Sequence, residues 1–421
     1  MLDIKKRRTF HITIFTENFS WAGGMEFIRI LVNALVQNDQ EFECKVTLVF
    51  HERYLFHGLN EVIWTTLRAA KDIITKRHLE PKKSPNRQLL LDFMKNIEGD
   101  FRVESYNGHS GSLSSCLKRI NPDVLFAPRN LVNQKYSIPW ISYIPDFQHK
   151  YYPHFFSSVE CLNRDINFAT IIRDAPAIIV NSDSARQDIY KYFPYARSRI
   201  FTLPFAAAPV ASWFTPSRED MSLKYGLPRK YFLICNQFWI HKSHITAFEA
   251  LHDLLIRKGN KEYCNIVCTG KPDDYRCPEY YEELKQKIRS LGMKDRIFLL
   301  GFVPKADQIQ IMKESIAVIQ PTLFEGGPGG GSVYDAIALG VPAIISDIPV
   351  NREIHAEGVR FFPVGSFEAL SGIMEAFAEN PPRRREKEDL IKEGRMRTTH
   401  LRQTLLEAIH FVADGNTAGG K

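Results

Sequence analysis

The stretch FEGGPGGGSVYDAIALGVPAI, residues 324–344, carries most of the information about the fold. An acid follows an apolar run, a glycine-rich turn comes next, and a helical pattern then runs to Gly340. Five glycines between Gly326 and Gly331 cost backbone entropy that a plain surface turn would not require. Close approach of the backbone to a phosphate, aided by the dipole of the following helix, would offset that cost. Ser332 and Asp335 also fit a capping box, S-x-x-D, which is the alternative role for Asp335.

Short apolar runs alternate with longer helical patterns on both sides of this stretch. The runs are rich in β-branched and aromatic residues and end at turn-forming residues. They cover residues 10–15, 45–50, 123–128, 140–145, 177–182 and 199–204, then 231–237, 265–270, 296–302, 316–322, 342–347 and 359–364. Continuous apolar strands between amphipathic helices are typical of parallel sheets covered on both faces. The sequence thus predicts the α/β class, with two Rossmann-like, doubly wound domains that face a central cleft.

The length of 421 residues also favours two domains, because one hydrophobic core rarely grows so large. We assign residues 1–205 to an N-terminal domain and residues 229–385 to a C-terminal domain. Residues 206–228 interrupt the pattern with three prolines and are predicted to be a linker. Residues 386–421 are predicted to form a helix that packs back on the N-terminal domain, followed by a loose tail.

Two further loops lie at the edge where doubly wound sheets bind ligands. In WAGGME, residues 21–26, Gly23 and Gly24 would let backbone N–H groups approach an anion at the start of a helix. A plain tight loop is the alternative, and the spacing differs from the G-x-G-x-x-G of dehydrogenases. In NQFWIHKSH, residues 236–244, Lys242 is predicted to project into the cleft toward a phosphate. A solvated surface charge is the alternative for this lysine.

Composition excludes several classes of protein. Hydrophobic residues make up 44% and charged residues 24% of the chain, so bulk disorder is not expected. There is no run of about 18 apolar residues, and the N-terminal apolar stretch is too short for a signal peptide. We therefore expect a cytoplasmic protein. The seven cysteines contain no C-x-x-C pair, which fits a reducing compartment and leaves zinc a weak hypothesis.

The formal net charge of +7 suits an anionic ligand, an anionic membrane surface or nucleic acid. Basic residues gather between Arg68 and Arg87, either as a solvated helix and loop or as a patch for anionic lipid. The second interpretation predicts peripheral contact with the inner face of the membrane. Basic and aromatic residues are not interleaved, so nucleic acid is not expected as a partner. The adjacent Asp273 and Asp274 favour a solvated turn over a metal clamp, and no metal site is predicted.

Together these residues resemble the retaining GT-B glycosyltransferases of family four, the glycosyl transferases group 1. The strongest part lies in PTLFEGG…SVYDAIALGVPAIISDIPVNRE, residues 321–353, which looks like the family's E-G pair, glycine turn, E-A-x-A-x-G-x-P and later glutamate. DRIFLLGFVP (295–304), AIIVNSDSARQDI (177–189) and the early GGME also look family-like, so the resemblance covers nearly the whole chain.

The resemblance implies a hexosyltransferase with its acceptor side on the N-terminal domain and its nucleotide-sugar donor side on the C-terminal domain. Such an enzyme moves a sugar to a saccharide or lipid-linked acceptor with retention of configuration, as in the synthesis of cell-surface polysaccharide. The nucleotide-sugar is a co-substrate, and neither a cofactor nor a divalent metal ion is implied.

The resemblance also implies roles for individual residues. Glu325 is the acid beside the donor sugar, where it would stabilise positive charge on the sugar or orient its hydroxyls. Asp335 takes the place of the acid that holds the ribose hydroxyls. Asp146 and His149 are further catalytic candidates, because they fall near a histidine–aspartate pair that contacts the sugar in the family. The groups implied to hold the diphosphate are Lys242, Gly23, Gly24, Gly329, Gly330, Gly331 and Ser332.

The chain departs from the family pattern at three places. Nine residues rather than seven separate Glu325 from Asp335, and the second acid is the shorter one. Gln237 stands where the family usually carries an arginine partner to the lysine, and we count it among the donor-binding candidates. Pro145 takes the place of the family histidine. These departures leave open a degenerate nucleotide-sugar binding protein, and a GT-B epimerase or phosphorylase would share the same fold.

Overall fold

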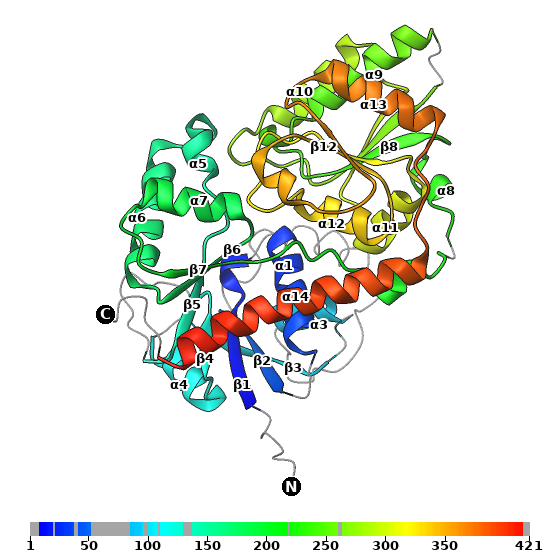
Figure 1. The fold of residues 1–421 in the computed structure, drawn as a ribbon. Coiled ribbons are helices and arrows are strands. Elements are labelled where there is room, and N and C mark those ends of the chain that lie inside the picture. Colours follow the sequence, from blue (N-terminus) through cyan, green and yellow to red (C-terminus); the bar gives the residue numbers. More distant parts are fainter. Residues whose placement is uncertain are drawn as a thin grey trace, which may run out of the picture.

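The computed structural model describes residues 8–19, 22–37, 41–51, 85–95, 97, 99–107, 110–128, 137–217, 219–259 and 263–415. These residues form two domains, each built on a parallel sheet with helices packed against it (Figure 1). Of the basic stretch between Arg68 and Arg87, the residues before 85 lie outside the described ranges, and Arg87 is exposed.

The first domain contains a parallel sheet in the order β3-β2-β1-β4-β5-β6-β7. Its strands are β1 (Arg8–Phe15), β2 (Phe42–His51), β3 (Phe101–Tyr106), β4 (Val124–Phe126), β5 (Trp140–Tyr143), β6 (Ala177–Val180) and β7 (Arg199–Thr202). Its helices are η1 (Glu17–Phe19), α1 (Ala22–Leu35), α3 (Pro85–Met94), α4 (Ser110–Ile120), α5 (Gln148–Tyr151), η2 (Pro153–Phe155), α6 (Ser158–Asp174) and α7 (Asp183–Tyr192). Two hydrophobic clusters pack against this sheet, one containing Ile12 and Ile14 and the other Phe15 and Val180.

The second domain contains a parallel sheet in the order β10-β9-β8-β11-β12-β13. Its strands are β8 (Tyr231–Cys235), β9 (Asn265–Thr269), β10 (Ile297–Gly301), β11 (Val318–Gln320), β12 (Ala343–Ser346) and β13 (Val359–Phe362). Its helices are η4 (Ile240–Lys242), α9 (His244–Lys258), α10 (Tyr280–Ser290), α11 (Lys305–Glu314), α12 (Gly330–Ala338), η5 (Pro349–Glu353) and α13 (Phe367–Glu379). The α/β class and the two doubly wound sheets predicted from the alternating pattern are confirmed.

Two local predictions in the first domain were wrong. β3 was missed because it is an edge strand, in which the polar Arg102 and Glu104 alternate with Phe101 and Val103. Edge strands do not need to be apolar on both faces, so a search for continuous apolar runs overlooks them. The expected loop at WAGGME is also shorter than predicted, since α1 already begins at Ala22 and both Gly23 and Gly24 lie in its first turn.

The segment between the two sheets contains η3 (Ala211–Phe214) and α8 (Met221–Tyr225). Trp213, Met221 and Leu227 are buried in a cluster with Leu233 and Val318 of the second sheet. The later part of the predicted linker therefore packs as part of the second domain.

The C-terminal helix α14 (Lys387–Ala413) crosses from the second domain to the first, where it lies across the sheet (Figure 1). Leu401, Leu405 and Ile409 are at most 3% exposed and share a cluster with Ile12 and Ile14 of β1. Burial of each such side chain contributes about 1.5–3 kcal/mol to stability. The helix therefore packs stably against the first domain.

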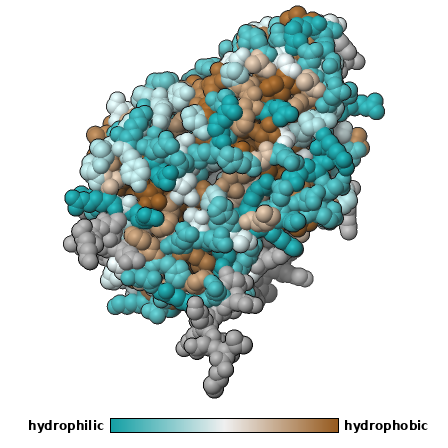
Figure 2. Space-filling model, in the orientation of Figure 1, coloured by the Kyte–Doolittle hydropathy of each residue, from teal (hydrophilic) through white to brown (hydrophobic). Residues whose placement is uncertain are grey.

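Hydrophilic side chains cover most of the face drawn in Figure 2, and hydrophobic ones gather mainly in its upper half, over the second domain. Among the described helices, none is both long enough and apolar enough to cross a membrane. All seven cysteines are free thiols.

Candidate active site

The order of each sheet reverses at one place, between β1 and β4 in the first domain and between β8 and β11 in the second. In doubly wound sheets, ligands bind beyond the carboxyl ends of the strands at this switch point. The loop after β8 contains Gln237 and Lys242, and the turn after β11 contains Glu325 and Gly329. The second domain therefore brings the two most informative predicted loops together at its switch point.

The turn after β11 packs directly on the first domain. A Cβ atom added at Gly326 would lie 2.3 Å from the carbonyl oxygen of Pro145, and one at Gly327 would lie 3.1 Å from Cβ of Asn181. The hydroxyl of Ser182 donates a hydrogen bond to the carbonyl oxygen of Gly326 at 3.0 Å. Glycine at 326 is thus required by contact between the domains.

Glu325 and Lys242 form an ion pair at the start of α12. Their charged atoms are 2.5 Å apart, and their side chains are only 10% and 12% exposed. The side-chain amide of Gln320 donates a second hydrogen bond to Glu325 at 2.8 Å, and Asn236 donates to Gln320 at 2.5 Å. A carboxylate with two fixed donors is held in one orientation.

Sequence reasoning missed Asn236 and Gln320, although both leave a signal. Each polar residue lies at or just after the end of an otherwise apolar strand, at the edge where ligands bind. Gln320 is fully buried, so its amide must have partners inside the protein.

The glycine turn leads into α12 through two residues in the left-handed region, Gly329 at φ 69° and Gly330 at φ 67°. α12 begins at Gly330, with Gly329 as its cap residue, and Gly331 is exposed. The first N–H groups of a helix have no partner within the helix and can bind an anion. The hydroxyl of Ser332 lies at this end, is buried, and has no hydrogen-bond partner among the described residues.

The capping-box interpretation of Ser332 and Asp335 was wrong. Ser332 is the third residue of α12 rather than its cap, and Asp335 lies in the middle of the helix. The carboxylate of Asp335 instead forms an ion pair with Lys305, the first residue of α11. Burial raises the pKa of Asp335, although the ammonium of Lys305 opposes this shift.

Another ion pair, Glu26 with Arg29, lies nearby on α1 of the first domain. Nε of Arg29 is 3.0 Å from each carboxylate oxygen of Glu26, and both side chains are largely buried. Burial works against ionisation of Glu26, but the contact with Arg29 outweighs burial and lowers its pKa. Because α1 contacts α12, this helix brings Gly23, Gly24 and the Glu26–Arg29 pair to the domain interface (Figure 1).

The first domain places Asp146 and His149 differently. Asp146 lies against the glycine turn, since a Cβ atom at Gly326 would be 2.8 Å from its own Cβ atom. His149 is 2% exposed, and its Nε2–H donates a hydrogen bond to the carboxylate of Asp165 at 2.9 Å, within the first domain. Burial lowers the pKa of His149, and its ring packs against Phe168. Asp146 is therefore better placed than His149 to face the second domain.

Gln237 is half-buried in the loop after β8. The approach of this loop to β9 depends on Gly270, where a Cβ atom would lie 1.9 Å from the carbonyl oxygen of Asn236. Gln237 brings no charge to this position.

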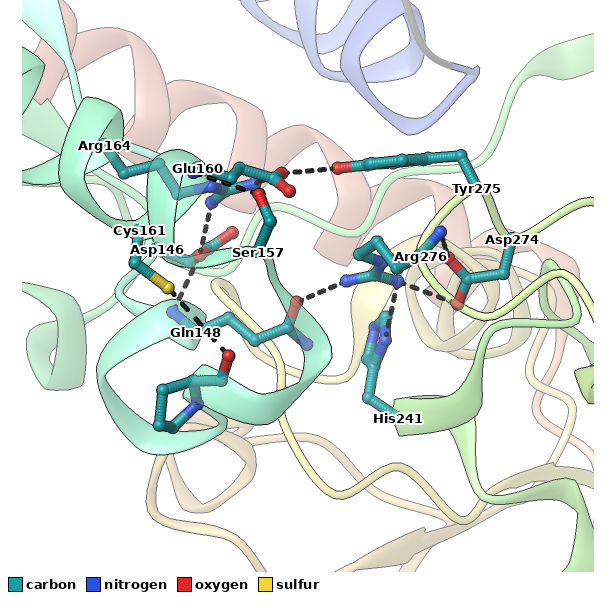
Figure 3. A network of polar contacts seen from close by, with 11 residues as sticks. Asp146, Gln148, Ser157, Glu160, Cys161, Arg164, His241, Asp274, Tyr275 and Arg276 are labelled. Atoms are coloured by element: carbon teal, nitrogen blue, oxygen red, sulfur yellow. Dashed lines mark hydrogen bonds and ion pairs between the residues drawn. The ribbon is translucent and has the colours of Figure 1, made fainter.

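Arg276 links the second domain to the first (Figure 3). Its guanidinium donates to Asp274 at 2.9 Å and to the side-chain oxygen of Gln148 in α5 at 2.9 Å. The aromatic rings of Trp239 and Phe156 lie 5.1 and 5.3 Å from the guanidinium carbon. Arg276 and Asp274 are 5% and 0% exposed at their side chains, so this pair is a buried ionic contact.

The expectation of a solvated turn at Asp273 and Asp274 was therefore wrong for Asp274. Two residues further along the chain, Arg276 folds back over this carboxylate and keeps it from water. Tyr275 extends the same link by donating to Glu160 of α6 at 2.7 Å (Figure 3). In the described part of the chain, no three His, Cys, Asp or Glu residues are grouped as metal ligands.

Glu353 makes a further contact between the domains. Its two carboxylate oxygens accept hydrogen bonds from the backbone N–H groups of Asp183 at 2.7 Å and Ser184 at 2.8 Å. These groups form the N-terminus of α7, where a negative charge is favoured. The last glutamate of the quoted motif therefore joins η5 of the second domain to α7 of the first.

Two facing Rossmann-like domains with the site between them define the GT-B fold, and comparison with known proteins agrees. Residues 218–397, most of the C-terminal domain, match the family glycosyl transferases group 1. Over 133 residues the chain is 27% identical to the O-antigen chain mannosyltransferase RfbU of Salmonella typhimurium strain LT2. This match spans 31% of the chain and 33% of RfbU, about a third of each.

Solved structures extend the similarity in fold to the whole chain. Anabaena HepE in complex with UDP and glucose has a TM-score of 0.60 at 16% identity, over 95% of this chain and 99% of HepE. A glycosyltransferase from Rickettsia africae has a TM-score of 0.58 at 14% identity, over 97% of this chain and 100% of that chain. The sucrose-phosphate synthase of Thermosynechococcus elongatus has a TM-score of 0.58 at 12% identity, over 96% of each chain.

Proposed function

We propose that this chain is a glycosyltransferase that moves a hexose from a nucleotide-sugar to a saccharide or lipid-linked acceptor with retention of configuration. The role we propose is in the synthesis of cell-surface polysaccharide. The similarity of part of the chain to an O-antigen mannosyltransferase supports this role. The match of residues 218–397 to the glycosyl transferases group 1 supports sugar transfer.

The observation that carries the proposal is the Glu325–Lys242 pair beside the start of α12. It combines one carboxylate, one cation and the N-terminus of a helix within one largely buried corner of the second domain. The charges of these groups are complementary to those of a bound nucleotide-sugar. The diphosphate is negative, and the sugar becomes positive as its bond to the diphosphate breaks.

In this reaction the glycosidic bond breaks and its electron pair leaves with the nucleoside diphosphate. Lys242 and the N–H groups of α12 stabilise the growing negative charge, typically by a few kcal/mol for each group. Glu325 stabilises the positive sugar or orients its hydroxyls, while the acceptor hydroxyl attacks from the face that the diphosphate leaves and gives its proton to the departing diphosphate. We assign no covalent intermediate to Glu325.

The test is a screen of UDP-, GDP- and dTDP-sugars for thermal stabilisation of the purified protein. A donor at 100 times its dissociation constant adds about 2.7 kcal/mol to the free energy of unfolding, which raises the melting temperature measurably. The stabilising donor is then incubated with and without saccharide acceptors, and the products are identified by NMR. Transfer with the anomeric configuration of the donor is expected. Rearranged sugar without an acceptor would identify an epimerase, and binding with neither transfer nor hydrolysis would identify a degenerate binding protein.

We also predict that transfer is independent of metal ions. The positive charge proposed to act on the diphosphate comes from Lys242 and from helix N–H groups, which chelators do not remove. Turnover should therefore persist after dialysis against EDTA, measured with the donor found in the screen. If activity were lost and then restored by magnesium or manganese, the proposed leaving-group chemistry would be wrong.

A further inference from the structure

Lys305 forms the second of two lysine–acid pairs along α12. The first is Lys242 with Glu325, next to the helix start, where a Cβ atom at Gly330 would lie 3.3 Å from Glu325. The second is Lys305 with Asp335, five residues further along the helix. In the described structure, the two acids of the motif thus each hold one lysine.

The two partners of the second pair differ in exposure. The side chain of Asp335 is 5% exposed, whereas that of Lys305 is 44% exposed. Lys305 begins α11, the helix that follows β10, and its ammonium lies 5.6 Å from the centre of the Trp213 ring. The acid is therefore fixed in the helix, while the longer and more exposed lysine can turn toward a ligand.

One charged pair and one neutral thiol lie near these two residues. Glu26 and Arg29 approach from α1, and Cys235 lies at the end of β8. Asp335 and Glu26 raise the pKa of Lys305 despite the opposing effect of burial, so its ammonium stays charged. The charges of Asp335 and Lys305 both act on the thiol of Cys235, so this pair lies near the strand end that leads to Gln237, two residues on. Because Gln237 is neutral, a cation from another element can supply the charge that is missing at this position.

The position along the helix indicates which phosphate this cation would meet. Five residues of helix correspond to about 7.5 Å along the axis. Lys242 is thus at the end of the site near the sugar, and Lys305 is toward the end near the nucleoside. Ser332 lies on α12 between Gly330 and Asp335, and its buried hydroxyl has no partner among the described residues.

We propose that Lys305 is the second cation of the donor site, and this inference rests on the proposed function. When a nucleotide binds, the ammonium of Lys305 leaves Asp335 for the phosphate attached to the ribose. The exchange leaves the carboxylate of Asp335 free to accept hydrogen bonds from ribose hydroxyls. Lys305 thereby provides the positive charge that Gln237 lacks.

The experiment measures binding of UDP, GDP and dTDP, and of the matching monophosphates, by titration calorimetry. Lys305→Met keeps the length of the side chain and removes its charge. It should weaken the monophosphate and the diphosphate alike, on the order of 10- to 100-fold, because both carry the phosphate attached to the ribose. Lys242→Met should weaken the diphosphate but leave the monophosphate nearly unchanged.

A second background separates contact with phosphate from simple neutralisation of Asp335. If Lys305 only balanced that acid, Lys305→Met would cost nothing once Asp335→Asn had removed the charge. We expect it to weaken the monophosphate in the Asp335→Asn background as well. Lys258→Met is the matched control, since Lys258 is 25% exposed, ends α9 and pairs with Glu375 and Glu379 of α13.

The outcomes distinguish this inference from the proposed function. If the wild-type protein bound none of the three diphosphates, the proposed function would fail and the inference with it. If the wild type bound one of them and Lys305→Met bound it equally well, the inference alone would fail. A loss confined to the background that retains Asp335 would likewise overturn it, because Lys305 would then act only on that acid.

Discussion

Replacement of Glu325 by glutamine is expected to lower the turnover of sugar transfer by about 100-fold or more, with donor affinity not reduced. The substitution keeps the shape of the side chain, and its amide oxygen can still accept the hydrogen bond from Lys242. It removes the negative charge next to the sugar, where positive charge grows in the transition state. Because Lys242 then loses its anionic partner, the diphosphate of the donor meets a less neutralised cation.

The measurement is single-turnover transfer at saturating donor, together with the dissociation constant of the donor from calorimetry. Glu379→Gln is the matched control, because Glu379 also pairs with a lysine but is 46% exposed at the far side of the second domain. Turnover at the wild-type rate would place the essential carboxylate elsewhere. Asp146 would then be the next candidate, since it lies against the same glycine turn.

The fold could be predicted largely because its information is local. Buried parallel strands need apolar residues on both faces, and such runs are visible along most of the chain. β3 escaped because an edge strand is exposed on one side and tolerates Arg102 and Glu104. The start of α1 was also misplaced, since the glycine pair indicated a loop where the structure continues the helix.

The site was harder to predict, because its electrostatics depend on partners far apart in the sequence. Lys242 and Glu325 are 83 residues apart, and only the packing of β8 beside β11 brings them into one ion pair. The pairing of Asp335 with Lys305 likewise requires α11 and α12 to be neighbours. Asp274 looked like a surface residue because its local sequence is polar, and nothing local indicates that Gln148 and Trp239 enclose its partner Arg276.

Replacement of Lys242 by alanine should have the other large effect, a loss of roughly 2–4 kcal/mol of transition-state stabilisation. This corresponds to a decrease in rate of roughly 30- to 1,000-fold. The side chain of Lys242 is 12% exposed, so its charge acts in a place where Coulomb interactions exceed their strength in water. Most of the loss should appear in turnover, because the negative charge of the leaving diphosphate is largest in the transition state. Weaker donor binding should accompany it.

The Lys242→Ala variant also changes the surroundings of Glu325. Without Lys242, the carboxylate of Glu325 would keep the amide of Gln320 as a donor but lose its cation. The Lys242→Ala, Glu325→Gln double variant separates the loss of the charge on the diphosphate from the cost of leaving the Glu325 carboxylate unpaired. It removes both charges, so the free energy of unfolding should recover while turnover does not. Lys258→Ala removes a paired lysine outside the site and should transfer sugar at the wild-type rate.

Gln237→Arg tests whether the loop after β8 lines the same phosphate. Gln237 lies five residues before Lys242 and is half-buried, so an arginine there can direct its guanidinium toward the start of α12. We expect it to restore part of the rate lost in Lys242→Ala, because a bidentate guanidinium replaces the missing charge on the diphosphate. Single-turnover transfer by the wild type, the two single variants and the double variant is the measurement. An unchanged rate in Lys242→Ala would refute the role of this lysine. Absence of rescue would instead place Gln237 away from the phosphate and leave Lys305 as the proposed second positive charge.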